Sequence, residues 1–256
     1  MREIDINSDL GEGYGPYRIA DDEALLNVVS SANIACGFHA GDPLIMDATV
    51  GTAVRLGVDI GAHVGFDDRM GFGRRRIHMS SKEVEKMTLY QLGALHAFAM
   101  AHGRKMTHMS AHGALGNLSF VDADVAAALM RAAKAFDPGL LIVTLPNTEA
   151  ERAAANAGLR VARLFLADRA YTDKGLLVSR DHAGAVIKDL DLVAKRVIEL
   201  LAEGTITTVT GQKIKAEVES ILVHSDTPGA VMLAHAVRSA VATADAKVTP
   251  LSKLRH

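Results

Sequence analysis

The chain has 256 residues, of which 49 % are hydrophobic and 23 % charged, so it can bury a core, and its composition excludes disorder. A formal net charge of −2, with one dense basic run at residues 74–76, excludes a broad nucleic-acid-binding surface and leaves small molecules and protein partners. The single cysteine, Cys36, excludes an internal disulfide, and no uncharged apolar stretch reaches the roughly 18 residues of a membrane span. Residues 1–5 lack the apolar run of a signal peptide. We therefore expect a cytoplasmic protein.

Short apolar runs alternate with longer segments of helical period, which is the pattern of βα units around a parallel sheet. Most of these runs are rich in Ile, Val, Leu or Ala, as strands buried on both faces should be. A length of about 250 residues is typical of one α/β barrel, and no stretch resembles an interdomain linker, so we expect a single domain over residues 1–256. The predicted strands are residues 3–7, 32–36, 58–62, 106–110, 140–144, 160–165 and 220–224.

Helix starts are indicated by a capping residue before a proline, or by a serine three residues before a glutamate. Two other segments, residues 172–188 and 205–217, contain glycines at turn positions and are predicted to be irregular insertions or hairpins. The predicted helix starts are Asp42 before Pro43, Ser80 with Glu83, and Thr227 before Pro228.

Nearly every predicted strand is followed within a few residues by ionisable or hydrogen-bonding side chains. The loops after the C-terminal ends of parallel strands converge on one mouth, so these groups are expected to meet in one cleft, as in an enzyme. In chain order they are Asp9 and Glu12; His39 and Asp42; His63, Asp67 and Asp68; His108, Ser110, His112 and Asn117; Asp168, Arg169 and Tyr171; and His224, Ser225, Asp226 and Thr227.

Several of these groups have a purely structural alternative. Asp42 and Asp226 precede predicted helix starts, where capping alone would explain them. A lone buried histidine is usually a hydrogen-bonded core residue, but histidines at four strand ends, positions 39, 63, 112 and 224, favour a functional role. Residues 71–76, Gly-Phe-Gly-Arg-Arg-Arg, either hold an anion or form a solvated turn. The sequence has no P-loop, nucleophile-elbow or His-Glu-x-x-His pattern.

The longest motifs resemble those of one known family. Residues 6–13, Ile-Asn-Ser-Asp-Leu-Gly-Glu-Gly, and residues 31–43, which end in His-Ala-Gly-Asp-Pro, are similar to the opening signature of the LamB/YcsF family, the A subunits of 5-oxoprolinase. Further matching segments continue to the end of the chain, so the resemblance covers nearly its full length. They are residues 61–63, 71–75, 90–95, 112–115, 167–171 and 224–230.

The resemblance implies both a fold and an activity. The fold is α/β, a seven-stranded (β/α) TIM-like barrel related to the polysaccharide-deacetylase and glycoside hydrolase barrels. The implied activity is the opening of the lactam 5-oxoproline to L-glutamate with ATP hydrolysis. The implied partners are 5-oxoprolinase subunits B and C. The chain could also form a homo-oligomer. ATP makes chemical sense, because phosphorylating the amide oxygen of an unstrained lactam turns a poor electrophile into one that water can attack.

If the chain has the activity that the resemblance implies, the types of the residues at the strand ends indicate their candidate roles. Carboxylates act as general bases or metal anchors and histidines as acid–base groups, whereas arginines hold anions. The catalytic candidates are Asp9, Glu12, His39, Asp42, His63 and His112, and the substrate- or anion-binding candidates are Arg74, Arg75, Asp168, Arg169, His224 and Asp226.

The chain departs from the family pattern beside His112. Where members usually read Lys-Pro-His-Gly-Ala-Leu-Tyr-Asn, this chain has Ser110, Ala111 and Gly116 in place of the lysine, proline and tyrosine, and a serine cannot supply the charge of a lysine. Val64 and Ser179 also replace prolines of the pattern. The departures favour a substrate that is another lactam, cyclic imide or amide, or an activity that has decayed.

Two other functions stay open at this level. The first is a metal-dependent amidohydrolase or deacetylase that works without ATP, with Asp9, His39 and His63 around a divalent ion, since such a site needs about three protein ligands and a position for water. The second is a non-catalytic subunit that binds substrate for its partners, which the missing lysine favours.

Overall fold

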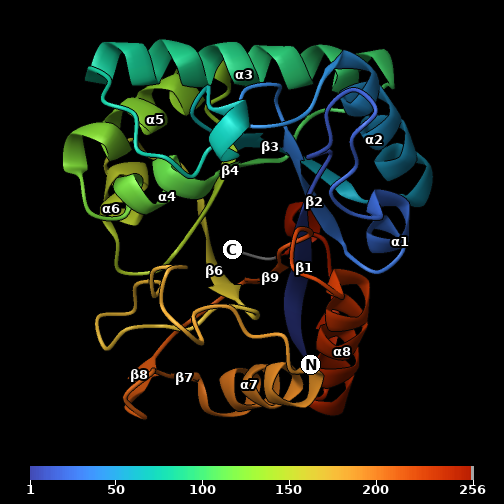
Figure 1. The fold of residues 1–256 in the computed structure, drawn as a ribbon, viewed down its shortest axis with the longest axis vertical. Coiled ribbons are helices and arrows are strands. Elements are labelled where there is room, and N and C mark those ends of the chain that lie inside the picture. The colour runs from blue at the N-terminus through green and yellow to red at the C-terminus, as the bar shows by residue number, and fades with distance from the viewer. Residues whose placement is uncertain (255–256) are drawn as a thin grey trace.

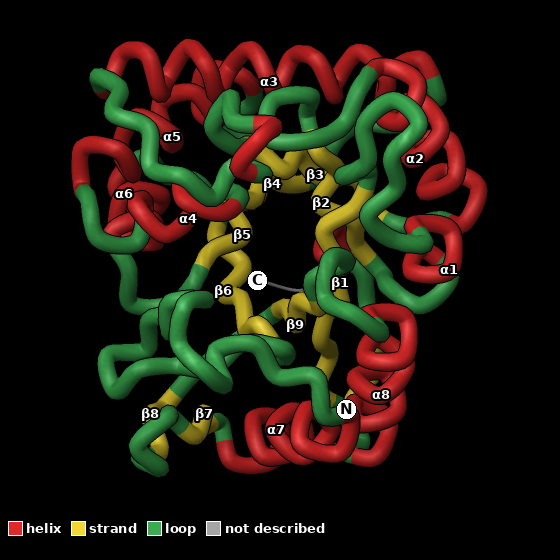
Figure 2. The backbone as a smooth tube through the Cα atoms, in the orientation of Figure 1, coloured by secondary structure: helices red, strands yellow, loops and turns green. Residues whose placement is uncertain are grey.

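Seven parallel strands form a closed barrel at the centre of the molecule (Figures 1 and 2). In the computed structural model, which describes residues 1–254, each barrel strand pairs with the next along the chain, and β9 closes the barrel by pairing with both β6 and β1. The expected seven-stranded (β/α) barrel is therefore confirmed. The barrel strands are β1 (Arg2–Leu10), β2 (Ser31–Ala35), β3 (Asp59–Val64), β4 (His108–Ala111), β5 (Leu141–Thr144), β6 (Val161–Leu166) and β9 (Ser220–Val223).

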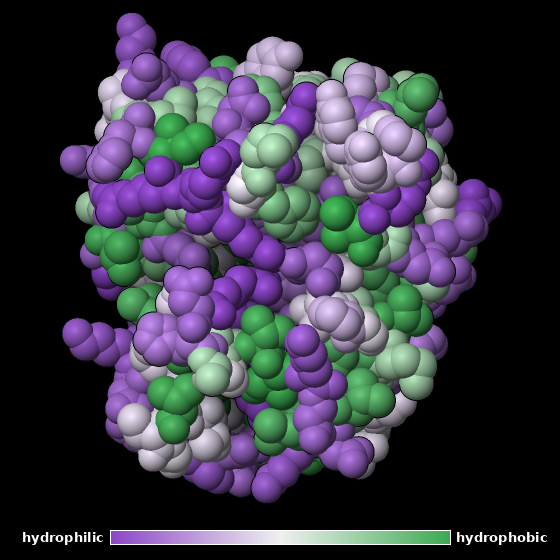
Figure 3. Space-filling model, in the orientation of Figure 1, coloured by the Kyte–Doolittle hydropathy of each residue, from purple (hydrophilic) through white to green (hydrophobic). Residues whose placement is uncertain are grey.

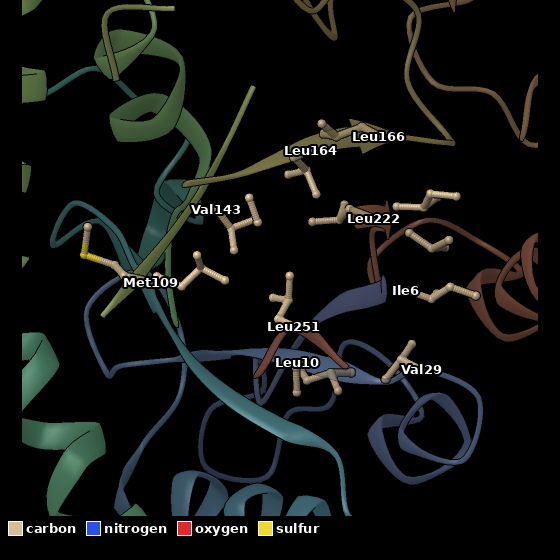
Figure 4. Packing of buried hydrophobic residues seen from close by; sticks show 14 of the residues in the cluster. Ile6, Leu10, Val29, Met109, Val143, Leu164, Leu166, Leu222 and Leu251 are labelled. Atoms are coloured by element: carbon tan, nitrogen blue, oxygen red, sulfur yellow. The ribbon is translucent and has the colours of Figure 1, made fainter. Parts of the chain in front are cut away.

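The register of the strands determines which side chains face the inside of the barrel. Asp5 pairs with Ser220, and Asn7 pairs with both Ser31 and Leu222, so every second residue from these positions shares the inner face. That face is polar over the first four strands and mainly apolar over β5, β6 and β9. We call Asn7, Asp9, Asn33, His63, His108 and Ser110 the polar wall, and Val143, Leu164, Leu166 and Leu222 the apolar wall (Figure 4).

Helices surround the barrel and begin at clear capping residues (Figure 1). The side chain of Asp42 accepts hydrogen bonds at the start of α2, and Ser80 and Glu83 form the predicted capping box at the start of α3. Gly57 ends α2 with a positive φ of 71°, a conformation that glycine adopts without steric cost. The helices are α1 (Asp22–Leu26), α2 (Pro43–Leu56), α3 (Ser81–Ala101), α4 (Gly113–Ser119), α5 (Ala123–Phe136), α6 (Glu149–Asn156), α7 (Leu190–Glu203) and α8 (Ala230–Thr243), with short 3₁₀ turns η1 (Arg69–Gly71) and η2 (Leu251–Lys253).

One predicted helix start is wrong. Helix α8 begins at Ala230 after Gly229, whose φ is +81°, rather than directly after Thr227 and Pro228. The hydroxyl of Thr227 instead donates a hydrogen bond to Asp168. Capping of α8 therefore explains neither Thr227 nor its neighbour Asp226.

The insertions after β6 and α7 differ from each other. Residues 205–217 contain a hairpin of β7 (Thr205–Thr207) and β8 (Lys213–Lys215), as one of the two expected alternatives. Residues 172–188 have no helix or regular strand, and an isolated bridge between Arg169 and Val186 ties this segment to the end of β6. This irregular segment lies beside the barrel mouth, where it can supply side chains to a site.

The bottom of the barrel is closed by the last elements of the described chain. Strand β10 (Ala246–Val248), which the sequence pattern does not reveal, pairs in parallel with the first residues of β1. In η2 the backbone N–H of Leu251 donates to Ser31 and that of Ser252 to Asp59, and Leu251 is buried inside the barrel (Figure 4). None of the helices in residues 1–254 is both long and apolar enough to cross a membrane.

Candidate functional site

Four buried side chains from the ends of neighbouring strands meet at the mouth of the barrel. Glu12 follows β1, His39 follows β2, His63 lies in β3 and His112 follows β4. One ligand atom of each lies within 4.8 Å of those of the other three. We call this set the Glu–His cluster.

The Glu–His cluster is held together by short contacts. Glu12 Oε1 lies 3.1 Å from His39 Nε2 and 3.4 Å from His112 Nδ1, and His63 Nε2 lies 2.9 Å from His112 Nδ1. The rings of His39 and His112 stack in parallel with centroids 3.8 Å apart. The second carboxylate oxygen of Glu12 accepts a hydrogen bond from Ser225.

Backbone groups around the cluster fix its orientation. His112 Nε2 donates to the carbonyl oxygen of Phe72 at 2.8 Å, which leaves Nδ1 of the neutral ring as the atom that faces the cluster. Two glycines give the rings room: a Cβ at Gly65 would lie 2.6 Å from His39 Nδ1, and one at Gly73 would lie 2.8 Å from His112 Cδ2. The loop after β3 therefore needs glycine at both positions.

Burial sets the charge of the cluster. It lowers the pKa of His39 to about 3 and lowers the pKa values of His63 and His112 well below their ordinary range, so all three rings are neutral at physiological pH. Burial, followed by the charge of Asp9, raises the pKa of Glu12 well above its usual value. A cation among these four groups would reverse the shift of Glu12.

The donor set fits a divalent transition metal ion. Three imidazoles and one carboxylate are the ligands that zinc and similar ions take in a four-coordinate site. In the described part of the chain the buried Nδ1 atoms of His39 and His63 have no hydrogen-bond partner, and their Nε2 atoms contact only other members of the cluster and Asp9. His112 already has the backbone partner that orients a metal-ligating histidine.

Asp9 lies next to the cluster but is held by a different set of contacts. Its Oδ1 accepts a hydrogen bond from Asn33 Nδ2 at 2.9 Å and lies 3.4 Å from His63 Nε2. The same amide donates to Asn7 Oδ1, and the Oδ1 of Asn33 lies 3.0 Å from His108 Nε2. Asn33 is thus the hub of the polar wall, and burial raises the pKa of Asp9.

A histidine–carboxylate pair lies on the other side of the mouth. His224 Nδ1 donates to Asp168, at 2.9 and 3.1 Å from its two oxygens, and Thr227 donates to the same carboxylate at 2.7 Å. Burial is the largest single effect and would lower the pKa of His224, but the charge and hydrogen bond of Asp168, together with the charge of Asp9, outweigh it and the pKa of His224 is raised. This pair is therefore suited to hold and release a proton.

Arginines add positive charge at the same mouth. Arg74 forms an ion pair with Asp226 at 2.7 Å, and Arg180 from the irregular segment lies 3.9 Å from the same carboxylate. Arg169 is different, because its guanidinium donates to the backbone carbonyls of Val178 and Ala185 and so holds the irregular segment in place.

A cavity of about 470 Å³ at this mouth is lined by members of each of these groups. Hydrophilic residues surround the hollow near the centre of the face shown in Figure 3. Four of the five positions that depart from the family pattern line it, namely Ser110, Ala111, Gly116 and Ser179. A Cβ at Gly116 would lie 2.5 Å from the carbonyl oxygen of Ala111, so this wall has no room for a side chain there. The polar and charged lining residues include Asp9, His63, Arg74, His112, Asn117, Arg169, Arg180 and His224.

The structure does not bring every predicted site residue to this cavity. Asp42 lies at the start of α2, where its carboxylate accepts hydrogen bonds from the backbone N–H groups of Gly15, Leu44 and Ile45, so the capping alternative accounts for it. Arg75 pairs with Asp68 and does not line the cavity. Four other candidates contact lining residues without lining the cavity themselves: Glu12, His39, Asp168 and Asp226. The remaining candidates line it: Asp9, His63, His112, Arg74, Arg169 and His224.

Two residues of the site are missed by sequence reasoning. Asn33 carries no charge and lies within a strand, although it falls inside the long motif of residues 31–43. Arg180 lies in the irregular segment, where the run from Leu177 to Arg180, similar to the Leu-Val-Pro-Arg of the family, is the one available signal.

Known proteins resemble this chain over nearly its whole length. The model of the LamB/YcsF family matches residues 4–256. A protein of Ralstonia nicotianae, named as the second 5-oxoprolinase A subunit of that organism, is 55 % identical over 98 % of this chain and 96 % of its own. The first 5-oxoprolinase A subunit of Pseudomonas syringae pv. tomato is 52 % identical over 98 % of both chains.

Solved structures agree. The lactam utilization protein from Thermus thermophilus superposes with a TM-score of 0.92 at 40 % identity, covering 98 % of this chain and 100 % of its own. The T48 deacetylase, at 14 % identity and a TM-score of 0.51, shares the fold alone. The chain therefore belongs to the LamB/YcsF family.

Proposed function

We propose that this protein is the A subunit of an ATP-dependent 5-oxoprolinase and that it opens the ring of a carboxylated lactam. The observation that carries the proposal is the cavity, which is lined by Asp9, His63 and His112 and also by the positively charged Arg74 and Arg180 and by His224. The names of the relatives, which refer to 5-oxoprolinase and to lactam utilization, support the same substrate class.

The charged groups suit a substrate that carries a carboxylate. Arg74 and Arg180 line the cavity and share one carboxylate partner, Asp226, so an incoming anion can take guanidinium contacts that Asp226 does not use. The raised pKa of His224 adds a third positive group. A lactam whose carboxylate is bound there would have its ring between the Glu–His cluster and the His224–Asp168 pair.

Ring opening requires two proton transfers. Water attacks the carbonyl carbon and gives up a proton, the C–O bond forms as the C–N bond breaks, and the ring nitrogen takes up a proton to become an amine. Asp9 suits the first transfer, because both of its contacts fall on Oδ1 and burial raises its pKa toward that of a useful base. The His224 imidazolium, held by Asp168, suits the second.

ATP would supply the driving force that an unstrained five-membered amide lacks. Transfer of its γ-phosphoryl group to the amide oxygen makes the carbonyl carbon electrophilic. A first water then adds to that carbon and the C–N bond breaks, which leaves an amine and an acyl phosphate. A second water hydrolyses the acyl phosphate and releases phosphate. Relatives named as A subunits support an assembly in which subunits B and C act together with this chain.

A second candidate function is metal-dependent amide hydrolysis without ATP. The Glu–His cluster favours it, because four buried donor atoms lie within 4.8 Å of one another. Glu12, His39, His63 and His112 would hold the ion, rather than the predicted set of Asp9, His39 and His63. A bound divalent ion would polarise the amide carbonyl or lower the pKa of water.

The first experiment is an assay for glutamate release from 5-oxoproline by the chain co-expressed with its candidate B and C partners, with and without ATP. We expect ATP-dependent release that His224→Gln reduces roughly 100-fold or more. His235→Gln, on the outer helix α8, is the matched control and should retain activity. Release that is independent of ATP would contradict the proposal and favour the second candidate.

The same preparations separate the two candidates by metal content. Protein purified without chelator is analysed for divalent metals, and His63→Ala is compared with the parent chain after both have been shown to fold. About one equivalent of metal that is lost in the variant, together with chelator-sensitive activity in the absence of ATP, would support the metal-dependent reaction. ATP-dependent turnover by metal-free protein would exclude it.

A further inference from the structure

The cavity has two chemically different sides. The polar wall faces it with Asp9, His63 and Ser110, whereas the apolar wall faces it with Val143, Leu164, Leu166 and Leu222 (Figure 4). All four apolar side chains are buried, and the register places Val143 beside Ser110, where the two walls join.

The cavity is large for a small lactam. An engineered apolar cavity of about 150 Å³ is enough to hold benzene, and 5-oxoproline is only somewhat larger than benzene. The volume here is about 470 Å³. A small lactam held by the arginines and the polar wall would leave the space along the apolar wall unfilled.

The small residues around α4 contribute to this space. Ala111, Ala114 and Gly116 line the cavity, and Ser110 at the end of β4 is also small. A Cβ at Gly116 would lie 2.5 Å from the backbone oxygen of Ala111, so the backbone packs closely at this position and no side chain from Gly116 can fill the cavity.

We propose that the preferred substrate is a carboxylated cyclic amide that carries an apolar substituent, which lies against the apolar wall. This inference rests on the proposed lactam-opening function and narrows its substrate class. A nucleotide base fits the apolar wall poorly, because Val143, Leu164, Leu166 and Leu222 have no groups to pair with its polar ring atoms. An alkyl chain has no polar atoms that would be left without hydrogen-bond partners against this wall.

The size of the expected preference follows from apolar burial. Each methylene group removed from water contributes about fourfold in affinity, until the space is filled. A substituent of two or three carbons should therefore improve binding roughly 15- to 60-fold over 5-oxoproline. Substituents that exceed the available space should lose this gain.

The test is a calorimetric titration of the assembled complex with 5-oxoproline and with derivatives that carry methyl to butyl groups on the ring. Val143→Phe fills the apolar side of the cavity and should lower the ratio of substituted to unsubstituted affinity at least tenfold. Leu222→Ala enlarges that side and should move the optimum to a longer substituent. Val209→Phe makes the same change at an exposed position and should leave the ratio unaltered.

The outcomes separate the inference from the function beneath it. Thermal denaturation first establishes that each variant folds. If Val143→Phe does not fold, Leu222→Ala still tests the inference. If every substituent lowers the affinity while 5-oxoproline is still turned over, the inference about the apolar substituent is wrong and the proposed function stands. A clear preference for substituted rings without any ring opening overturns the proposed function alone. Absence of binding by the whole series overturns both.

Discussion

Asn33 is the residue on which the geometry of the polar wall depends. Its amide donates to Asp9 and Asn7 and its oxygen accepts from His108, so all of its polar atoms are used. Asn33→Ala should lower kcat roughly 10- to 100-fold, because Asp9 loses the contact that fixes its position. The free energy of unfolding should fall by about 1–3 kcal/mol, since His108 keeps a buried N–H without an acceptor.

Asn27→Ala is the matched control for this prediction. Asn27 donates to the backbone oxygen of Glu23 at the exposed end of α1, so its loss should cost little stability and no activity. Steady-state kinetics and urea denaturation measure both effects. Equal activity of the two variants would show that Asn33 does not position Asp9.

The His224–Asp168 pair predicts a change in the pH profile. Asp168 raises the pKa of His224 against the opposing effect of burial, so Asp168→Asn should let burial lower the pKa below its ordinary value of 6.5. If protonated His224 delivers the proton, the alkaline limb of kcat/KM then moves to lower pH. Asp124→Asn, on the exposed side of α5, should leave this limb in place. An unmoved limb in Asp168→Asn would assign it to another group.

The part of the site that can be predicted from sequence consists of residues whose type implies chemistry. Histidines and carboxylates at strand ends identify His39, His63 and Glu12, because parallel strands bring their C-terminal ends to one mouth. An asparagine inside a strand, such as Asn33, has no comparable signal. The partner of Arg180 also cannot be predicted, since the irregular segment has no periodicity that would place it.

Aspartates serve both as helix caps and as catalytic groups, and Asp42 serves as the cap of helix α2. Asp42→Ala should lower the free energy of unfolding by about 0.5–2 kcal/mol and leave kcat unchanged, because its carboxylate serves the backbone at the start of α2. Asp122→Ala, which removes the equivalent cap of α5, should have an effect of the same size. Denaturation and steady-state kinetics distinguish these outcomes from a catalytic role, which a large loss of kcat in Asp42→Ala would indicate.

The elements that can be predicted are those with buried, regular patterns. All seven barrel strands lie where short apolar runs indicate them, although β1 extends to Leu10 because its polar residues face the inside of the barrel rather than a loop. β10 has three residues and too little pattern to be recognised. The start of α8 is misplaced because Thr227 resembles a cap but bonds to Asp168, a partner distant in sequence.

At the scale of the whole molecule, Asp5 makes stability depend on pH. Burial raises its pKa from 3.8 to about 6, although Ser30, Ser31 and Ser220 donate to it. Between these values the folded state binds more protons than the unfolded state, so the free energy of unfolding falls as pH rises through this window. The decrease from this group is about 3 kcal/mol and is nearly complete by about one pH unit above the folded-state pKa of about 6.

Urea denaturation between about pH 4 and pH 7, for the parent chain and for Asp5→Asn, measures this contribution. The difference in stability between the two proteins should shift in favour of the variant as pH rises, because the variant has no charge to bury. Groups that titrate elsewhere affect both proteins equally and cancel in the difference. A difference that does not change with pH would show that Asp5 keeps one protonation state.

The pairing of β1 with β9 also has a consequence for the growing chain on the ribosome. Asp5 and Ser220 are neighbours in the barrel but are 215 positions apart in sequence. β1 can pair with β2 early, yet its other edge stays open until β9, at residues 220–223, has been synthesised. Closure of the barrel therefore has to wait for β9, and we expect the nascent chain to expose this unpaired edge of β1 until then.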